Sequence, residues 1–378
     1  MNILLITQLF PADSAARYSS GALREFALEW EKAGHCVQVI RPHFAYEKEP
    51  FREKPFIIGR NIQVEFIQPK RVPLVKWTFY SYAKLRKKLQ FAPDVVVCHL
   101  YNSYFTFSGL ARQLKVPFVI GIHMSDIKIA KNWFHRFHQQ MVFRQASGFA
   151  CRSQSYEKQF SEIFPSHADK TFLAQSGIPP DYLKMKTTSE DSPITRIITV
   201  SRLEKRKQID RVIRALKELS VESDWHYTIV GEGGEKDELK RLTNELDLNE
   251  HVHFAGALPR AEVMEQLQQH EVFVLPSYQE TFGLVYLEAM AAGCLVIGSR
   301  NEGIDGIIQD GENGFLCDAA IQESIQAKLM EAISLDADGR KRIHQRAEQT
   351  IENFTLENKA NEYLNHLKKL VDRSSAVS

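Results

Sequence analysis

Residues 272–297 read VFVLPSYQETFGLVYLEAMAAGCLVI, and this stretch decides the fold. Its two ends, 272–275 and 295–297, are short apolar runs, which are typical of buried parallel strands. Between them, residues 282–292 carry a helical pattern. A strand, a helix and a second strand in close succession predict an α/β architecture with a parallel sheet.

The same alternation extends over nearly the whole chain in two series. In the second series, further strands are expected at 197–200, 227–230 and 253–254, and further helices at 209–219, 235–246 and 261–268. In the first series, strands are expected at 3–7, 37–40, 94–98 and 118–122, with helical patterns between most of them. Two such series predict two Rossmann-like, doubly wound domains that face each other across a cleft.

The polar stretch KMKTTSEDSP at 184–193 is the expected linker. We therefore assign 1–185 to an N-terminal domain and 186–355 to a C-terminal domain. The last helical pattern, at 356–372, can pack on either domain, and we place it on the first. Ligands of open parallel sheets bind beyond the carboxyl ends of the strands, so the site is expected between the two domains.

Composition and charge narrow the class of protein. The 378 residues include five scattered cysteines without a CxxC pair, and no apolar leader or membrane-length segment is found. These features predict a cytoplasmic protein with reduced thiols. Residues 1–170 hold 24 Lys and Arg against 13 Asp and Glu, and the rest of the chain holds 24 against 34. A basic first half favours an anionic partner, either nucleic acid or an anionic membrane surface.

Two carboxylates stand out in the quoted stretch. Glu280 lies in the loop after the strand at 272–275, and Glu288 lies eight residues further on, within the predicted helix. In a helix this interval corresponds to about 12 Å, which is too far for a close acid/base pair but suits the two ends of an extended ligand. Phe282, Gly283 and Leu284 are expected to open the helix, where free N–H groups form an anion site. A sugar–diphosphate–ribose ligand fits this layout.

This arrangement resembles the Glu-x7-Glu motif of glycosyltransferase family 4, whose members are retaining enzymes with two Rossmann-like domains (the GT-B fold). Other motifs follow in the order and spacing of that family. They are SRLEKRK at 201–207, VGEG at 230–233, EAMAAG at 288–293 and DGENGF at 310–315. The resemblance is strong over about residues 195–320 and looser before them.

The resemblance implies roles for residues of the second domain. Arg202 and Lys207 would hold the donor diphosphate and offset its charge as it leaves, which is where charge develops in the transition state. Glu280 would accept sugar hydroxyls and Glu288 ribose hydroxyls. One departure is that Asp305-Gly306 stands where many relatives carry Pro-Glu.

The resemblance also assigns residues of the first domain. A glycine-containing loop after the first strand approaches the donor phosphates in the family, and Gly21 is its remaining glycine here. His123, after the strand at 118–122, occupies the place of a histidine that faces the reacting sugar. His99 holds a similar position one strand earlier and is not expected to be catalytic.

The implied activity is that of a hexosyltransferase (EC 2.4). It would transfer a sugar, with retention, from a nucleotide-sugar, most commonly a UDP-sugar, to a hydroxyl of a lipid-linked or cell-envelope glycan. No cofactor and no metal are expected. Asp336 and Asp338 have the Asp-x-Asp spacing of metal-binding glycosyltransferases, but their place before a helical pattern is explained by N-capping.

Two segments of the first domain mix basic and aromatic residues. They are KRVPLVKWTFYSYAKLRKK at 70–88 and KNWFHRFH at 131–138. Such segments suit a membrane interface with anionic lipid, so a peripheral position on the inner face of the membrane is expected. The alternative is that the aromatics belong to the core and the cations to a solvated face. Nucleic acid is not expected as a partner, because the donor-site motifs argue against it.

Two other functions remain open on sequence alone. A nonhydrolysing nucleotide-sugar epimerase shares the two-domain layout but would consume the donor without an acceptor. A non-catalytic nucleotide-sugar-binding subunit would keep the fold without the chemistry. The full set of Arg202, Lys207, Glu280, Glu288 and His123 favours transfer.

Overall fold

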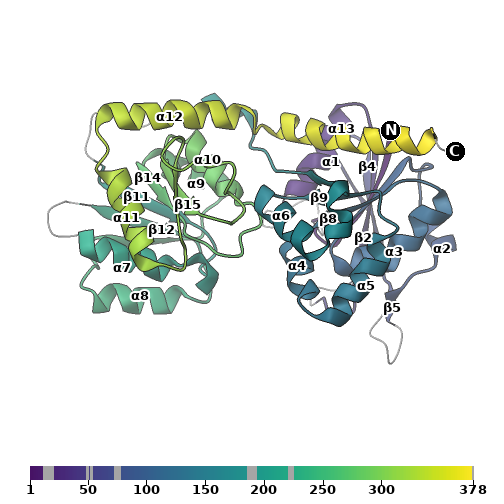
Figure 1. Ribbon diagram of the computed structural model, residues 1–378, viewed down its shortest axis with the longest axis horizontal. Helices are drawn as coiled ribbons and strands as arrows, with labels where there is room; N and C mark the ends of the chain where they lie inside the picture. The colour runs from purple at the N-terminus through teal and green to yellow at the C-terminus, as the bar shows by residue number, and fades with distance from the viewer. Residues whose placement is uncertain are drawn as a thin grey trace. The chain divides into compact units, whose positions relative to one another are not determined.

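The computed structural model describes residues 1–11, 21–47, 51, 54–71, 78–184, 194–219 and 225–376 (Figure 1). The chain folds into two compact units. The first unit comprises Met1–Arg152, Tyr156–Ser176 and Leu356–Ser378, and the second comprises Ser153–Ser155 and Gly177–Thr355. Each unit is built on its own parallel sheet with helices, which confirms the predicted pair of Rossmann-like α/β domains.

The first unit contains an eight-stranded sheet in the order β10-β9-β8-β7-β1-β2-β4-β3, parallel except for β3. Its strands are β1 (Asn2–Ile6), β2 (Cys36–Pro42), β3 (Phe56–Ile58), β4 (Ile62–Ile67), β7 (Val95–His99), β8 (Phe118–Ile122), β9 (Gly148–Cys151) and β10 (Thr171–Leu173), with the ribbon β5 (Lys70–Arg71) and β6 (Thr78–Phe79) beside it. Its helices are α1 (Ala22–Lys32), α2 (Tyr82–Arg86), α3 (Tyr101–Leu114), α4 (Met124–Ala130), α5 (Trp133–Phe143), α6 (Gln154–Ile163) and α13 (Leu356–Ser375). The strand order reverses between β1 and β7, which is the kind of point at which open α/β sheets bind ligands.

The second unit contains a six-stranded parallel sheet in the order β13-β12-β11-β14-β15-β16. Its strands are β11 (Arg196–Val200), β12 (His226–Val230), β13 (Val252–Gly256), β14 (Val272–Val274), β15 (Leu295–Ser299) and β16 (Phe315–Cys317). Its helices are α7 (Ile209–Leu219), α8 (Lys236–Glu245), α9 (Arg260–Gln268), α10 (Leu284–Ala291), α11 (Gln322–Ile333) and α12 (Ala337–Glu352). Numbered within the unit, the order is 3-2-1-4-5-6, the doubly wound order of dinucleotide-binding sheets. The strand order of this sheet reverses between β11 and β14.

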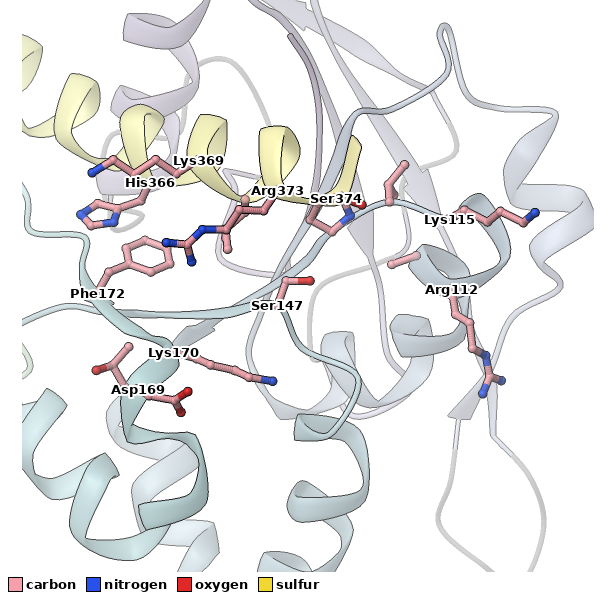
Figure 2. Close-up of a pocket in the computed structure, with 15 residues that line it drawn as sticks. Arg112, Lys115, Ser147, Asp169, Lys170, Phe172, His366, Lys369, Arg373 and Ser374 are labelled. Atoms are coloured by element: carbon pink, nitrogen blue, oxygen red, sulfur yellow. The ribbon is translucent and has the colours of Figure 1, made fainter. Parts of the chain in front are cut away.

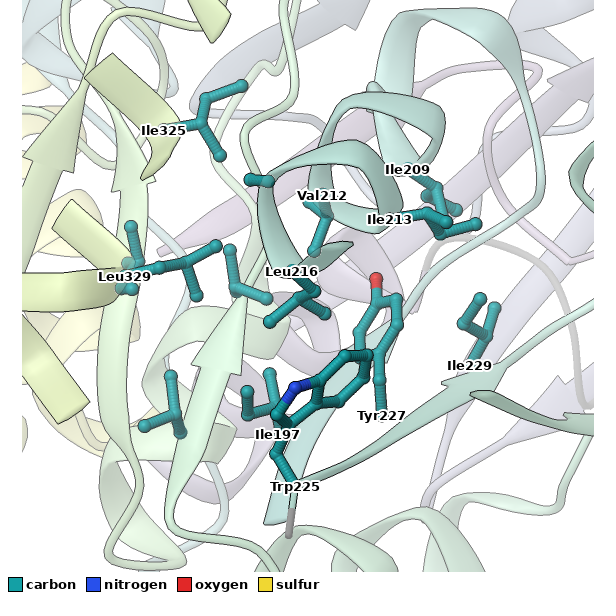
Figure 3. Packing of buried hydrophobic residues seen from close by; sticks show 14 of the residues in the cluster. Ile197, Ile209, Val212, Ile213, Leu216, Trp225, Tyr227, Ile229, Ile325 and Leu329 are labelled. Atoms are coloured by element: carbon teal, nitrogen blue, oxygen red, sulfur yellow. The ribbon is translucent and has the colours of Figure 1, made fainter. Parts of the chain in front are cut away.

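Apolar stripes of the helices close the core of the second unit. Val212, Ile213 and Leu216 of α7 are fully buried and belong to the same cluster as Trp225 and Tyr227 at the start of β12 (Figure 3). The spacing of one and three residues along α7 places these side chains on one helical face. Burial of that face against the sheet fixes the end of the loop that connects β11 to α7.

The boundary between the units lies at Ser176–Gly177, nine residues before the predicted 185–186. The physical reason is that the segment after Gly177 packs on the second unit. Ile178 is fully buried in a cluster of that unit and its N–H donates to the carbonyl of Phe354, at 2.8 Å. The following 3-10 helix, Pro180–Lys184, contacts α10 and α12. The predicted linker after Lys184 lies outside the described residues.

Helix α13 lies beside α1 on the first unit (Figure 1). Tyr363 of α13 is fully buried, and its ring contacts Phe26 and Trp30 of α1 edge-on, with centroids 5.4 and 5.2 Å away. The indole N–H of Trp30 donates to the carbonyl of Ala360, at 3.0 Å. The last segment of the chain is therefore part of the core of the first unit.

Among the helices that the structure describes, none combines the length and apolarity that a membrane crossing requires.

We expect Tyr363→Ala to lower the free energy of unfolding by about 3–5 kcal/mol, because it removes a buried aromatic ring and leaves a cavity. Tyr363→Phe is the matched control. The Tyr363 hydroxyl has no hydrogen-bond partner among the described residues, so its loss should be neutral or slightly stabilising. Urea denaturation followed by circular dichroism measures both. A cost below about 1 kcal/mol for the alanine variant would show that α13 is dispensable for the unit.

Candidate functional site

The reversal of strand order in the second unit brings two predicted site residues together. Lys207 ends the 3-10 helix Lys205–Lys207 in the loop after β11, and Glu280 lies in the loop after β14. They are 73 residues apart in sequence, yet the Lys207 ammonium donates directly to Glu280 Oε2. Both side chains are largely buried, with 8% and 15% of their surfaces exposed. The structure thus unites a cation and a carboxylate at the carboxyl ends of neighbouring strands.

Further groups hold the Glu280 carboxylate in place. The Ser277 hydroxyl donates to Glu280 Oε2 at 3.3 Å, and a guanidinium nitrogen of Arg206 lies 3.6 Å from the same oxygen. Arg206 lies within the quoted basic segment, but the sequence assigned it no role. Its position next to Lys207 in a short 3-10 turn is the signal that could have identified it, because adjacent residues of that turn face the same loop.

The backbone of Glu280 is anchored by Glu302, which the sequence analysis also missed. The carboxylate of Glu302 accepts the N–H of Glu280 at 2.8 Å, and the N–H of Gly303 donates to the carbonyl of Glu280 at 2.8 Å. Burial raises the pKa of Glu302, although backbone N–H groups of Gln279 and Glu280 act in the opposite direction. Glu302 therefore supports the Glu280 loop from the segment just before Asp305-Gly306.

Arg202 does not contact Glu280. Its side chain is 80% exposed, and its nearest carboxylate is Glu204, at 3.4 Å. Glu204 in turn accepts a hydrogen bond from Arg206 at 2.8 Å, and Arg206 lies beside Glu280. A chain of alternating charges thus connects Arg202 with the buried pair, while Arg202 itself stays free to reorient toward a ligand.

The helix after Glu280 begins at Leu284, so the prediction that Phe282 and Gly283 form its first residues is wrong. Gly283 is the N-cap, with φ at 79°, in the left-handed region that excludes most side chains. A Cβ at Gly283 would lie 2.4 Å from the Tyr286 ring. Phe282 is 4% exposed and packs in the core of the unit, whereas Leu284 is half-buried. The free N–H groups of α10 therefore follow a glycine, as an anion site requires.

Glu288 lies on α10, and its partner is a residue that the sequence analysis did not select. Arg260, the first residue of α9, donates to Glu288 Oε1 from two nitrogens, at 2.7 and 3.1 Å. The guanidinium of Arg260 also lies 5.5 Å from the centre of the Tyr182 ring. Glu288 is 8% exposed, and its pairing with Arg260 keeps its charge compensated. The place of Arg260 at the start of α9, directly after the loop that follows β13, is the signal that could have found it.

The glycines of the VGEG motif serve the backbone of the site. A Cβ on Gly231 would lie 1.8 Å from the carbonyl oxygen of Ser201, and one on Gly233 would lie 2.2 Å from that of Leu203. The N–H of Leu203 also donates to the carbonyl of Glu232, at 3.0 Å. This close approach of two loops fixes the start of the segment that carries Arg202 and Lys207.

In the first unit, His123 begins the turn into α4 and contacts His99 at the end of β7. His99 Nδ1 and His123 Nε2 are 2.9 Å apart. Burial, followed by the positive charge of Arg152, lowers the pKa of His123 to about 3, and burial lowers that of His99 as well. Gly121 makes room for this pair, because a Cβ there would lie 2.0 Å from the His99 ring. His123 is therefore a neutral imidazole, as a hydrogen-bonding role requires.

Asp126 positions His123. One of its oxygens accepts the N–H of His123 at 2.8 Å, and the other accepts the hydroxyl of Tyr104 at 3.0 Å. Gln139 then donates to the Tyr104 oxygen at 2.9 Å. Burial raises the pKa of Asp126 to about 7, although these hydrogen bonds oppose the shift. The structure therefore adds Asp126, His99 and Tyr104 to the surroundings of the predicted residue.

The remaining predicted features are placed as follows. Gly21 is the N-cap residue of α1, and most of its loop, residues 12–20, lies outside the described part of the chain. The predicted N-cap at Asp336 is confirmed, because its side chain accepts the N–H of Gly339 at 2.8 Å. No group of three or more His, Cys, Asp or Glu side chains suited to a metal is found among the described residues.

We expect His123 to make stability depend on pH. The unfolded chain binds a proton on this residue below about pH 6.5, whereas the folded protein does so only near pH 3, so stability falls as the pH drops between these values. His123→Gln should therefore lose less stability between pH 7 and pH 5 than the natural protein. Asp126, whose raised pKa acts in the opposite direction, is present in both proteins.

Urea unfolding at the two pH values measures this difference. His253→Gln, at an exposed position of β13, is the matched control. If His123→Gln and His253→Gln lose the same stability as the natural protein, the neutral state of His123 is contradicted.

Two family models together match nearly the whole chain. The model described as Glycosyltransferase Family 4 matches residues 22–182, and the model described as Glycosyl transferases group 1 matches residues 184–350. The N-acetyl-alpha-D-glucosaminyl L-malate synthase of Bacillus anthracis is 30% identical over 360 residues, which is 90% of each chain.

Solved structures show the same fold. Sucrose-phosphate synthase from Thermosynechococcus elongatus aligns with a TM-score of 0.75 over 98% of this chain and 99% of its own, at 19% identity. Anabaena HepE in complex with UDP aligns with a TM-score of 0.74 over 98% and 100%, at 18% identity. The chain therefore belongs to glycosyltransferase family 4 and is a glycosyltransferase (EC 2.4) with two Rossmann-like domains of the GT-B type.

Proposed function

We propose that this glycosyltransferase moves a hexosyl group from a UDP-sugar to a hydroxyl acceptor, with retention of the anomeric configuration and without a metal. The single observation that carries the proposal is the buried Lys207–Glu280 pair, with Arg206 beside it, at the strand reversal of the second unit. It combines cations for a diphosphate with a carboxylate for sugar hydroxyls.

The pair suggests how the donor would be received. A diphosphate would compete with Glu280 for the Lys207 ammonium, which is hydrogen-bonded to Glu280, and for the Arg206 guanidinium, which is ion-paired with it at 3.6 Å. Phosphate oxygens and carboxylate oxygens accept hydrogen bonds from the same cationic donors. Glu280, released from Lys207, then accepts hydrogen bonds from sugar hydroxyls. The exposed side chain of Arg202 adds a second cation where charge develops on the leaving group.

The proposed step breaks the bond from the anomeric carbon to the donor phosphate oxygen and forms a bond to the acceptor oxygen on the same face. The acceptor proton passes to the departing phosphate oxygen, so no external base is required. The neutral imidazole of His123, held by Asp126 and His99, supports the reacting sugar by hydrogen bonding.

UDP is the proposed nucleotide. Three of the structural neighbours are complexes of HepE with UDP, UDP and glucose, or UDP-glucose. A mycobacterial relative, 34% identical over 152 residues, is named as GDP-mannose-dependent, so guanine is the base to test against uracil.

The proposed acceptor is a lipid-linked or cell-envelope glycan, reached from the cytoplasmic face of the membrane. Helix α5 supports this, because Trp133, Phe134, Phe137 and Met141 are about half exposed or more, and Trp133 reaches 74%. These side chains lie beside Lys131 and Arg136, which is the mixture expected at an anionic membrane surface. Residues 72–77 of the other basic and aromatic segment lie outside the described part. L-malate, named for the Bacillus anthracis relative, belongs in the acceptor panel.

A thermal-shift assay with UDP, GDP, ADP and NAD, each with and without EDTA, tests the donor site. A ligand present at a hundred times its dissociation constant stabilises the folded state by about 2.7 kcal/mol, so UDP should raise the melting temperature, and EDTA should not change the shift. The substitution Glu288→Ala should reduce the rise in melting temperature that UDP causes. A response to NAD alone, or to none of the four, would contradict the assignment.

We expect Lys207→Ala to lower kcat by about a hundredfold or more, because it removes a cation beside the leaving group. Lys205→Ala is the matched control, since Lys205 lies in the same 3-10 helix, is exposed and forms no ion pair among the described residues. Its kcat should stay within about twofold. Steady-state kinetics of nucleotide release, with a melting curve to show that each variant is folded, measures both. Equal kcat values for the two variants would remove Lys207 from the transfer site.

A further inference from the structure

A groove with a volume of about 940 Å³ opens in the first unit, between α13, the end of α3 and the start of β10 (Figure 2). Its lining includes five cationic side chains and one acidic side chain, Asp169. The cations are Arg112, Lys115, Lys170, Lys369 and Arg373. We refer to it as the basic groove. None of the proposed transfer machinery lines it.

The basic groove lies at the opposite edge of the sheet from His123. Val116 and Pro117 come just before β8, and Ser147 comes just before β9, so the groove meets the strands at their amino ends. His123 follows the carboxyl end of β8. The five residues of β8 span about 16 Å, so the two places are separate sites.

Five cationic side chains line the groove against a single acidic one, so most of its positive charge is not balanced. Within the described residues, none of the five cations forms an ion pair, and Lys170 Nζ donates instead to the carbonyl of Ala146, at 3.1 Å. That contact fixes an ammonium group beside Ser147. Burial and then the charge of Lys369 lower the pKa of His366, although the carboxylates of Glu362 and Glu157 act in the opposite direction. A groove with this potential attracts anions.

Specific packing contacts hold the walls of the groove in place. His366 stacks on Phe172 with ring centroids 4.6 Å apart and an interplanar angle of 12°. A Cβ on Gly148 would lie 3.0 Å from Leu370 and 3.1 Å from Phe172, so glycine allows α13 to approach the sheet. Figure 2 shows His366 and Arg373 extending from α13 on the side of Phe172, whereas Lys115 points away from the other labelled residues.

The chemistry of the lining indicates the class of ligand. Guanidinium groups bind phosphate through paired hydrogen bonds, and ammonium groups bind it as point charges. Phe172 is 7% exposed and stacked against His366, so its ring is not available to stack with a nucleobase. We propose that the basic groove is a second anion site, which binds a ligand with two or more phosphate groups through charge alone. This site is independent of the transfer site proposed above.

Calorimetric titration of the full chain with tripolyphosphate at low salt tests the proposal. Lys170→Gln/Arg373→Gln should weaken binding at least tenfold, which corresponds to about 1.4 kcal/mol. The matched control, Arg60→Gln/Lys158→Gln, removes two exposed charges of the same unit outside the groove and should change the affinity by less than about twofold. Melting curves show that each variant is folded.

A third variant, Arg202→Ala/Lys207→Ala, shows whether tripolyphosphate binds in the basic groove or at the transfer site. If it abolishes tripolyphosphate binding while the groove variant does not, the anion binds at the transfer site and the proposal is overturned. Flotation with phosphatidylcholine vesicles, with and without phosphatidylglycerol, separates the two sources of phosphate. If only the groove variant no longer binds the phosphatidylglycerol vesicles, the ligand is a lipid headgroup. If the groove variant still binds these vesicles but no longer binds tripolyphosphate, the ligand is soluble. If neither measurement separates the groove variant from its control, the groove is not an anion site.

Discussion

Parallel strands can be joined only by long crossovers, and the point at which those crossovers change direction is where the buried Lys207–Glu280 pair of this protein is assembled. In the second unit the change falls between β11 and β14. Loops from the two strands diverge there, and each contributes one member of the Lys207–Glu280 pair. The other features of the unit follow from this placement. Gly231 and Gly233 let a neighbouring loop support the β11 loop, Glu302 holds the β14 loop, and the buried face of α7 fixes the far end of the β11 connection.

Burial of the Lys207–Glu280 ion pair has a desolvation cost that lowers the stability of the folded state. Removal of two charges from water is offset by their attraction only when their remaining hydrogen-bonding groups are satisfied. Here Ser277 and Arg206 supply some of these contacts, and Arg206 is in turn held by Glu204. Such a pair is better suited to exchange than to permanence, because an incoming dianion can replace the carboxylate as the partner of the cations. Glu288 and Arg260 repeat the same arrangement on α10 and α9.

The two edges of the sheet in the first unit differ in their electrostatics. At the carboxyl edge, burial and Arg152 keep His123 and His99 neutral, and Asp126 sets the position of His123. At the amino edge, the basic groove collects five cations with a single acidic neighbour. Three of these cations, Arg112, Lys115 and Lys170, belong to the basic first part of the sequence, and the other two, Lys369 and Arg373, come from α13. Helix α13 thus adds positive charge at this edge, which is the physical basis for the proposed anion site.

The sequence by itself determined the two βα series, the order of the motifs, the N-cap at Asp336 and the selection of Lys207, Glu280, Glu288 and His123. The apolar pattern of each strand or helix shows which of its residues are buried, and this pattern can be recognised within a short stretch of sequence. It did not determine short strands such as β9 and β10, whose three or four residues carry too weak a pattern. Only the tertiary structure decided the partners of the site: Arg206 and Glu302 for Glu280, Arg260 for Glu288, and Asp126 and His99 for His123. It also placed the left-handed N-cap at Gly283, attached Ile178 to the second unit, and brought Arg112, Lys170 and Arg373 into one groove. These decisions depend on which strands become neighbours in each sheet, and the spacing of residues along one chain does not contain that information.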